Sequence, residues 1–541
     1  MTPQDATTPT HAALPPERVP LTSTDEPVRD AVSDRSVTPA LPDRYRRTVL
    51  TNYLHSAALI LVAIGVTPVL VRSLGKTEFG IWALVGTLAL YLELLEFGFA
   101  GATVRKIAEF DAVARREQLR RAVATSFWLL TIPGLIALAL GVAVAFLFPV
   151  IFDVPASLEA AATILVLLVT FDLALSIPAD TFGGVLIGLQ RYDLLNATLI
   201  ATVLAQAAAW VVILALGGGL VALGIATISI SLAGQLARFV IARRLVPEIR
   251  LSRRHFDRKL VRPLATLSVW YSIEEISWVV RSRADVIIVG VIAGVPAAAI
   301  YAVGQKLALA GTSLVAPVAD GFFPLSSALA AKGDTARLRG AIVTGTRISL
   351  AIALPLAITI GVLAVPALDA WVGAGFEEAG TVVVLLVANA ALKALPSVGI
   401  RMLMGIGTFR TPSIAFAFEA VLSVSLSVAL GLRYGIVGVA LAAVIATVAV
   451  HICFAVPYIA REFGLSLVRW SASLARAHAA PAIATGLLGW LFLELDVSGL
   501  GPVAAAGACM MIAYLALLAV TGMSAAERRS ARRFAFGRRR T

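Results

Sequence analysis

The feature that most constrains this chain is a series of long apolar runs that begins near residue 48 and continues almost to the end. Each run is about one bilayer long, because a helix needs about 20 mostly apolar residues to cross the hydrocarbon core. The runs are continuous and rich in Leu, Ala, Val and Gly, so they lack the alternation typical of outer-membrane strands. Within a bilayer, a single continuous segment satisfies its own backbone only as a helix. We therefore predict an all-α polytopic membrane protein.

The composition supports the same class. Of 541 residues, 59% are hydrophobic and only 14% are charged, which is too little polar surface to coat an ordinary soluble enzyme. The two cysteines, Cys453 and Cys509, lie inside apolar runs, where a small hydrophobic role is expected. We accordingly predict no disulfide framework, no metal site and no cofactor.

Turn residues and charge clusters divide the apolar region into fourteen predicted spans. They cover residues 49–71, 80–103, 122–147, 158–178, 193–216, 219–242, 264–292, 297–325, 341–365, 380–400, 411–432, 436–458, 477–497 and 500–522. The predicted units are a disordered cytoplasmic tail (1–43), a six-helix N-terminal lobe (44–247), a basic linker (248–262), a six-helix C-terminal lobe (263–460), two additional helices (461–522) and a basic tail (523–541).

The positive charges predict the orientation of these spans. The even-numbered connections and the two ends carry 33 Lys and Arg residues, whereas the odd-numbered connections carry three, namely Arg72, Lys76 and Arg433. Cytoplasmic connections of membrane proteins are enriched in Lys and Arg. We therefore expect both termini in the cytoplasm.

The net charge of +12 has the same explanation. The basic residues lie in short cytoplasmic connections and in the segment from Arg528 to Arg540, so topology accounts for them without nucleic acid. A second interpretation gives that segment and the 243–262 connection an accessory role in binding anionic membrane lipid.

An internal repeat links the two halves. In chain order, Gly75 and Trp82 match Gly294 and Tyr301 at an offset of 219 residues, Gly188 and Tyr192 match Gly405 and Phe409 at 217, and Gly219 matches Gly435 at 216. Three matches in order predict a duplicated six-helix unit, with both copies in the same orientation and related by an axis along the membrane normal. In transporters such repeats commonly enclose a substrate site near the bilayer midplane.

Three motifs carry a resemblance to a known family. They are RSLGKTEFGIW at 72–82, GLQRY at 188–192 and YGIVG at 434–438. With Phe97, Gly98 and Arg105 after the first motif, they resemble Wzx-type oligosaccharide flippases of the multidrug/oligosaccharidyl-lipid/polysaccharide exporter superfamily. The likeness covers roughly residues 45 to 460. The fourteen-helix count is similar to that of the peptidoglycan-precursor flippase in the same superfamily.

This resemblance implies a flippase of the bacterial inner (plasma) membrane. Its expected cargo is an oligosaccharide on undecaprenyl diphosphate, moved from the cytoplasmic to the outer leaflet by alternating access and delivered to polysaccharide polymerase machinery. The resemblance also suggests that basic cavity residues hold the diphosphate, a task that suits the bidentate geometry of Arg.

The predicted seventh and eighth spans contain the basic residues that fit this role. Arg281, Arg283 and Lys306 lie near mid-membrane, where a charged group costs about 2.5 to 3.5 kcal/mol and needs a partner or a wet cavity. We take these three as candidate diphosphate or sugar ligands. An alternative is that Arg281 simply pairs with Asp285, four residues further along the helix.

Several acids also fall within the predicted spans. They are Glu93, Glu96, Asp172, Glu274, Glu275 and Asp285, with Asp320 and Glu419 in addition. Either the first six bind a coupling H+ or Na+, or they pair with Arg281, Arg283, Lys306 and Lys393. The lone histidines His55 and His451 are expected to be packed core residues with no part in a site.

Two other functional classes remain as alternatives. An ion-coupled exporter of organic cations or drugs on the same fold would explain the membrane acids. A membrane enzyme is disfavoured because the predicted outer connections are short and carry neither a metal-ligand cluster nor a nucleophile with a base. No P-loop sequence that would indicate an ATP-driven pump occurs.

Overall fold

A computed structural model describes residues 43–96, 99–249, 251–312 and 315–522, and within these ranges the chain is helical. The predicted tails fall outside the described residues, apart from Asp43. The order of elements follows the predicted repeat, with each half beginning in a very long helix.

The first half contains α1 to α6. Their bounds are α1 Asp43–Glu93, a short 3-10 turn Leu94–Glu96, α2 Phe99–Ala112, α3 Arg116–Ile151, α4 Glu159–Gly188, α5 Tyr192–Ala215 and α6 Leu220–Leu245. A second 3-10 turn, Arg253–His255, leads into the other half.

The second half contains α7 to α13, followed by the last two helices. Their bounds are α7 Arg258–Thr312, α8 Ala316–Ala331, α9 Thr335–Val362, α10 Ala364–Val372, α11 Glu378–Gly405, α12 Arg410–Thr447, the π-helical turn η3 Val448–Ala455, α13 Val456–Glu462, α14 Leu467–Glu494, α15 Leu500–Leu517 and a closing turn Leu518–Gly522. Side chains cap some of these helices: Asp334 accepts from the amide of Arg337 at α9, and Ser466 does so for Arg469 at α14.

The number of crossings agrees with the prediction. Ten helical stretches of the described residues are long and apolar enough to span a membrane. Three of them contain a backbone break, at Gly75, Gly294 and Gly435, so each supplies two crossings. The 28-residue α14 is not among the ten stretches but is long enough to cross a bilayer, and with it the total is about fourteen. The spans predicted at 80–103 and 297–325 are each divided, because α1 and α7 end at Glu93 and Thr312 and separate helices follow.

The backbone confirms the internal repeat. Gly75 has φ 70° and ψ 179°, and its counterpart Gly294 has φ 80° and ψ 176°. This conformation favours glycine, and it lets both halves reverse direction in the same way. The turn after Gly188 has the hydrogen bonds of the turn after Gly405: Leu189, Gln190 and Arg191 donate to residues four, three and five positions back, as do their counterparts 217 residues later.

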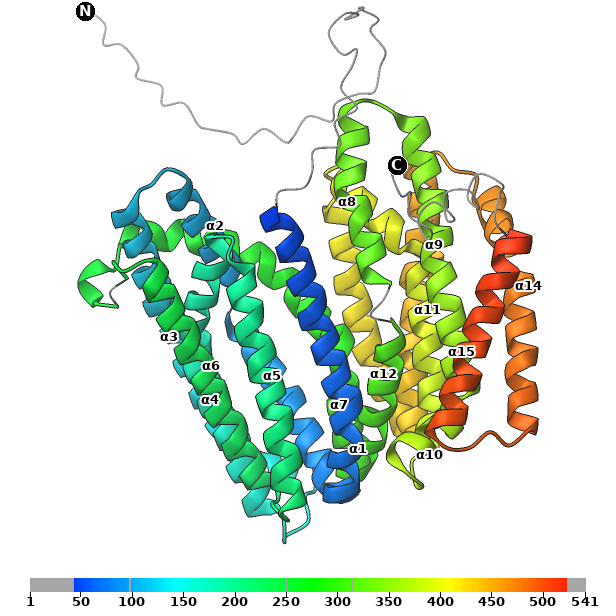
Figure 1. The fold of residues 1–541 in the computed structure, drawn as a ribbon, viewed down its shortest axis with the longest axis horizontal. Helices are drawn as coiled ribbons and strands as arrows, with labels where there is room; N and C mark the ends of the chain where they lie inside the picture. Colours follow the sequence, from blue (N-terminus) through cyan, green and yellow to red (C-terminus); the bar gives the residue numbers. More distant parts are fainter. Residues whose placement is uncertain (1–42, 97–98, 250, 313–314, 523–541) are drawn as a thin grey trace, which may run out of the picture.

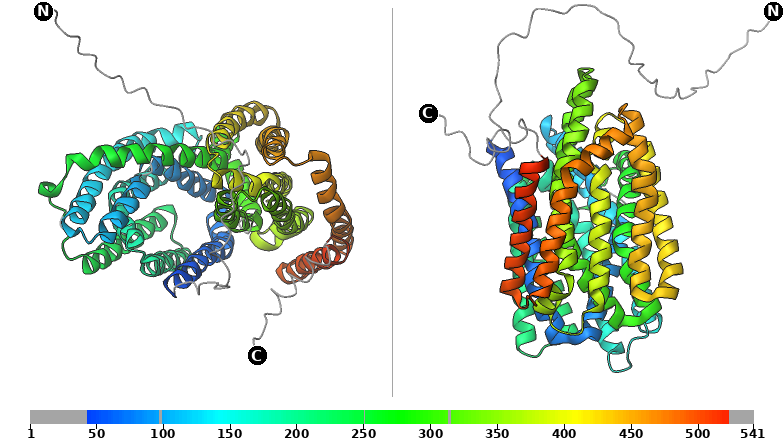
Figure 2. Two further views of the ribbon diagram at one scale, coloured as in Figure 1. Left: turned by 90° about the horizontal axis from the view of Figure 1, so that it is seen from above. Right: turned by 90° about the vertical axis from the view of Figure 1, so that its right-hand side faces the viewer.

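The helices form two bundles side by side (Figure 1). Helices α3 to α6 lie together in one bundle, and α8, α9, α11 and α12 lie in the other, with α1 and α7 between them. The start of α1 and the end of α15 lie on the same side of the molecule, and α10 lies on the opposite side. Helices α14 and α15 lie at the edge of the second bundle, against α9 (Figure 2).

The two bundles meet most closely near the glycine breaks of α1 and α7. A Cβ at Gly80 would collide with the carbonyl oxygen of Val295, and a Cβ at Gly290 would lie 2.6 Å from the side chain of Leu84. Small residues at such crossings let membrane helices approach closely. The largest buried core joins both bundles here and includes Phe79, Leu84 and Val295.

Candidate functional site

Side-chain contacts join the two bundles on the α10 side. The indole of Trp371 donates to the carbonyl oxygen of Ile64 at 2.8 Å, and Arg72 donates to the carbonyl oxygen of Trp371 at 3.2 Å. The ammonium of Lys76 lies 5.3 Å from the centre of the Phe376 ring, a cation–π contact. These contacts of α10 and the residues after it hold the second bundle against α1.

Lys306 contributes to this junction. Its ammonium donates to the hydroxyl of Thr67 at 3.2 Å and lies 5.2 Å from the centre of the Phe79 ring. Both partners belong to α1, whereas Lys306 belongs to the second half of α7. The predicted cation is therefore located between the lobes, with its charge directed at the first lobe.

Arg283 is the one predicted cation without a partner among the described residues. Its side chain is partly buried, its Nε is buried without a hydrogen-bond partner, and the described residues offer it no ion pair. A guanidinium left unpaired at this depth is costly unless a ligand or water completes its hydrogen bonds. Of the three predicted basic ligands, Arg283 is thus the one that is available to an anion.

Arg281 has a partner, although not the one four residues away. Its Nη1 donates to Glu419 on α12 at 2.9 Å, and its guanidinium lies 4.4 Å from the centre of the Phe416 ring. Asp285 accepts instead from the Tyr301 hydroxyl at 2.8 Å and from the Ser427 hydroxyl at 3.5 Å. The expectation that Arg281 pairs with Asp285 is wrong, because the packing of α12 against α7 supplies a closer carboxylate.

Glu419 is the centre of a cluster that the sequence does not reveal. Its side chain is 2% exposed and contacts the Lys393 ammonium at 3.2 Å and His451 Nε2 at 3.0 Å, in addition to Arg281. The hydroxyl of Thr447 donates to it at 3.3 Å. The expectation that His451 is a packed core residue is correct for its burial and wrong for its contacts. Position within a span singles out Glu419 and Lys393, but no spacing pattern joins them to His451.

The predicted acids of the first lobe lie apart from this cluster. Asp172 has a buried Oδ1 without a hydrogen-bond partner among the described residues. Further along the same helix, Asp180 lies 4.0 Å from Arg238 of α6. Glu93 is exposed at the end of α1, and Glu96 is partly buried at the end of the 3-10 turn that follows. The side chains of Glu274 and Glu275 lie outside the described residues.

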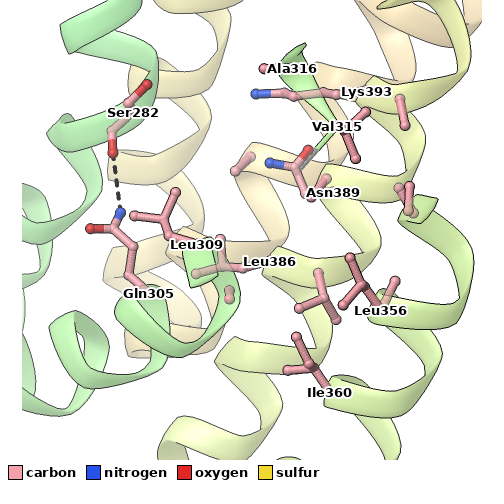
Figure 3. Close-up of a pocket in the computed structure, with 18 of the residues that line it drawn as sticks. Ser282, Gln305, Leu309, Val315, Ala316, Leu356, Ile360, Leu386, Asn389 and Lys393 are labelled. Carbon is pink, nitrogen blue, oxygen red and sulfur yellow. Dashed lines mark hydrogen bonds between the residues drawn. The ribbon is translucent and has the colours of Figure 1, made fainter. Parts of the chain in front are cut away.

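A cavity of about 390 Å³ lies inside the second bundle beside the cluster (Figure 3). Lys393 and Asn389 of α11 point into it from one side, and Gln305 of α7 faces them, its amide donating to the carbonyl oxygen of Ser282 at 3.2 Å. Arg281 and Asp285 also line the cavity. Most of the remaining lining is alanine, leucine and valine. The described residues contain no group of three or more potential metal ligands.

Known proteins resemble this chain over most of its length. The Bacillus subtilis (strain 168) protein "Uncharacterized membrane protein EpsK" is 24% identical over 426 residues, which are 77% of this chain and 82% of that protein. The structure of the lipid II flippase MurJ in an inward closed conformation matches with a TM-score of 0.67 at 14% identity, covering 86% of this chain and 98% of that one.

A multidrug resistance MATE family transporter of the MOP superfamily, in an inward-facing conformation, matches with a TM-score of 0.65 at 15% identity, covering 75% of this chain and 94% of that one. These likenesses confirm the predicted MATE/MurJ-like fold. The family model described as "Polysaccharide biosynthesis protein" matches residues 50–330, more than half of the chain. The chain therefore belongs to the polysaccharide biosynthesis protein family.

Proposed function

We propose that this protein is a flippase for a polyprenyl-diphosphate-linked oligosaccharide. It moves the lipid-linked sugar from the cytoplasmic to the outer leaflet of the bacterial inner membrane for the assembly of a surface polysaccharide. Undecaprenyl diphosphate is the proposed carrier, and polymerase machinery is the proposed recipient. The family and the fold support a transporter of this kind.

The observation that carries the proposal furthest is the guanidinium of Arg283, for which the described residues provide no ion pair. A diphosphate offers several anionic oxygens, and Arg can bind two of them in one plane. Arg283 lies near the middle of α7, the helix that separates the two bundles. Lys306, on the same helix beyond the break at Gly294, supplies a second cation whose bond to Thr67 is weak enough to be exchanged for a phosphate oxygen.

The arrangement of the two lobes supports alternating access as the mechanism. The contacts of Trp371, Arg72 and Lys76 hold the lobes together on the α10 side, which the positive charges predict to face outward. Release to the outer leaflet requires these contacts to break and equivalent contacts to form on the opposite side. The sugar remains in a polar cleft during this change, while the polyprenyl tail stays in lipid.

The test removes the protein from its host and determines which leaflet of the inner membrane holds the lipid-linked oligosaccharides. We expect complete units to accumulate on the cytoplasmic side and the wild-type gene to reverse this. Arg283→Ala should reduce rescue at least about tenfold, since it removes a charge-assisted bond worth about 1.5 to 3 kcal/mol. Lys306→Ala should have a smaller effect.

Two further variants refine the test. Arg283→Lys keeps the positive charge and removes the bidentate geometry, so it measures the importance of that geometry. Arg337→Ala, which alters an exposed cytoplasmic cation, is the control.

One outcome would favour the exporter instead. If the distribution of lipid-linked oligosaccharide is unchanged while the deletion sensitises cells to organic cations, the flippase proposal fails. The acids Asp172, Glu93, Glu96 and Asp285 would then be the first candidates for binding a drug or a coupling H+ or Na+.

A further inference from the structure

The Glu419 cluster contains more positive groups than one carboxylate needs. Glu419 Oε2 contacts Arg281 and His451, and its Oε1 contacts Lys393. Arg281, Lys393 and Glu419 together carry one excess positive charge when His451 is neutral, and two when it is protonated. The next acid, Asp285 of α7, lines the same cavity but is bonded to Tyr301 and Ser427 rather than to either cation. A simple structural ion pair would be complete with one cation, so the composition of the cluster requires another explanation.

His451 is placed where a proton would change this balance. Its side chain is 5% exposed, its ring stacks on Phe416, and its Nδ1 is buried without a hydrogen-bond partner among the described residues. The charged or polar groups that face it are Glu419 and Thr447 from α12, with Lys393 of α11 and Arg281 of α7 bonded to the same carboxylate. Because an ionised carboxylate only accepts, Nε2 of the neutral ring already donates to Glu419, and a further proton binds at Nδ1. The positive charge on the ring then strengthens the bond to Glu419 and weakens the hold of Glu419 on the other two cations.

The cations released in this way lie at the wall of a cavity. Arg281 and Lys393 line the cavity of about 390 Å³, and the Lys393 ammonium is directed into it next to the Asn389 amide (Figure 3). The Oδ1 of Asn389 is buried without a hydrogen-bond partner among the described residues. An acidic group in this cavity would meet Lys393 directly and would neutralise the excess charge of the cluster.

We infer that His451 and Glu419 form a proton-binding site whose occupancy is linked to the binding of an acidic group, a carboxylate or a phosphate, in the adjoining cavity. The coupling is reciprocal: if the proton raises the affinity for the anion by some factor, the anion raises the affinity for the proton by the same factor. The inference depends on the proposed function in one respect, namely that the acidic group belongs to the cargo. It assigns to the second lobe a coupling site that includes none of the predicted coupling acids.

The first experiment measures transport in inverted membrane vesicles from the deletion host carrying the wild-type or variant protein. Movement of the lipid-linked oligosaccharide is followed with and without a pH gradient, which nigericin collapses in potassium buffer. We expect the wild-type rate to fall at least about tenfold without the gradient and the rate of His451→Gln to be insensitive to it. His55→Gln, which changes the membrane histidine of α1, should behave like the wild type.

The outcomes separate the two proposals. Absence of wild-type transport in these vesicles contradicts the proposed function. Transport that ignores the gradient in the wild type, or that follows it equally in His451→Gln, leaves the flippase proposal intact and overturns the proton site.

The second experiment does not need transport or the native cargo. The full chain, labelled with ¹⁵N-histidine and placed in nanodiscs, has five histidines, and His451→Gln assigns the relevant signal. The pH dependence of this signal is then measured with and without an added anion. Its midpoint should rise with glucuronate or with inorganic phosphate but not with glucose, and the rise should be lost in Lys393→Met. A signal that does not titrate, or that neither anion shifts, overturns the inference.

Discussion

The two lobes have the same backbone fold but differ in charge where three equivalent helices meet. With the repeat offset of 217 residues, Lys393 and Glu419 correspond to Ser176 and Thr202, and with the offset of 216, His451 corresponds to Gln235. In the first lobe the Gln235 amide donates to the hydroxyls of Ser176 and Ser231, so these equivalent positions carry no charge, and the nearest acid is Asp172, one turn before Ser176 on α4. In the second lobe the equivalent junction surrounds a buried carboxylate.

A second pair of equivalent positions differs in the opposite sense. Asp172 in the first lobe corresponds to Asn389 in the second, and each has a buried Oδ1 without a hydrogen-bond partner among the described residues. The first lobe therefore has a carboxylate where the second has an amide. The comparison teaches that the two repeats keep polar side chains at equivalent positions where their helices meet. The charge of those side chains differs between the repeats.

The largest expected effect comes from removing the central carboxylate. Glu419→Ala leaves Arg281 and Lys393, both partly buried, without the carboxylate that they share, so we expect the free energy of unfolding to fall by about 3 kcal/mol. Denaturant titration in mixed micelles measures this. Thr202→Ala, at the equivalent position of the first lobe, removes only a hydroxyl bonded to the Thr198 carbonyl oxygen and should cost less than about 1.5 kcal/mol. Equal losses in both variants would contradict the contrast between the lobes.

The next effect tests how closely the lobes are joined. Gly80→Ala places a methyl group against the backbone of Val295, so α1 and α7 must separate, at an expected cost of about 1 to 3 kcal/mol. Gly86→Ala on the same helix meets no atom within 4 Å and should be neutral or slightly stabilising. Thermal unfolding of the two variants is compared in the same lipid. If Gly80→Ala is as stable as Gly86→Ala, α1 and α7 can separate at this contact without loss of stability.

A double-mutant cycle sharpens the comparison at the level of single contacts. For Lys393→Met and Glu419→Gln, we expect an interaction free energy near the upper part of the range of about 0.5 to 3 kcal/mol that contacting pairs show. For Ser176→Ala and Gln235→Leu in the first lobe, a neutral hydrogen bond predicts a value of about 0.5 to 1.5 kcal/mol. Additive losses at the Lys393 pair would mean that Glu419 does not hold Lys393.

The smallest effect is expected at Asp172. Asp172→Asn keeps the shape of the side chain, and Oδ1 of Asp172 has no hydrogen-bond partner in the part of the chain that the structure describes, so the free energy of unfolding should change by less than about 1 kcal/mol. Flipping in the vesicle assay should keep its dependence on the pH gradient if the coupling site is at His451. Loss of that dependence in Asp172→Asn would move the coupling site to the first lobe.

Much of the fold follows from local properties of the sequence. Continuous apolar runs become helices because a bilayer provides no partner for an unpaired backbone group, and the breaks at Gly75 and Gly294 coincide with the first repeat match. The divisions after Glu93 and Thr312 escape prediction, because the apolar composition continues through both. Hydropathy reports where the chain enters lipid and carries little information about a break inside an apolar run.

The candidate site was predicted only in part, and the reason is the range of the interactions. That Arg283 and Lys306 lie within spans, and so need partners or a wet cavity, is a property of single residues and can be read from the sequence. The partner of Arg281 is 138 residues away, and the sequence pattern favours the nearer Asp285. Partner choice depends on which helices pack together, as does the environment of His451.

The sequence by itself thus determined the helical class, the approximate number of crossings and the duplication, because these depend on hydrophobicity and on backbone freedom at single positions. Only the tertiary structure decided which charges neutralise each other, where a cavity remains, and that Arg283 among the predicted cations stays without a partner in the described residues. Electrostatic pairing acts over a few ångströms between residues that are distant in the chain, so it becomes defined only when the helices have packed.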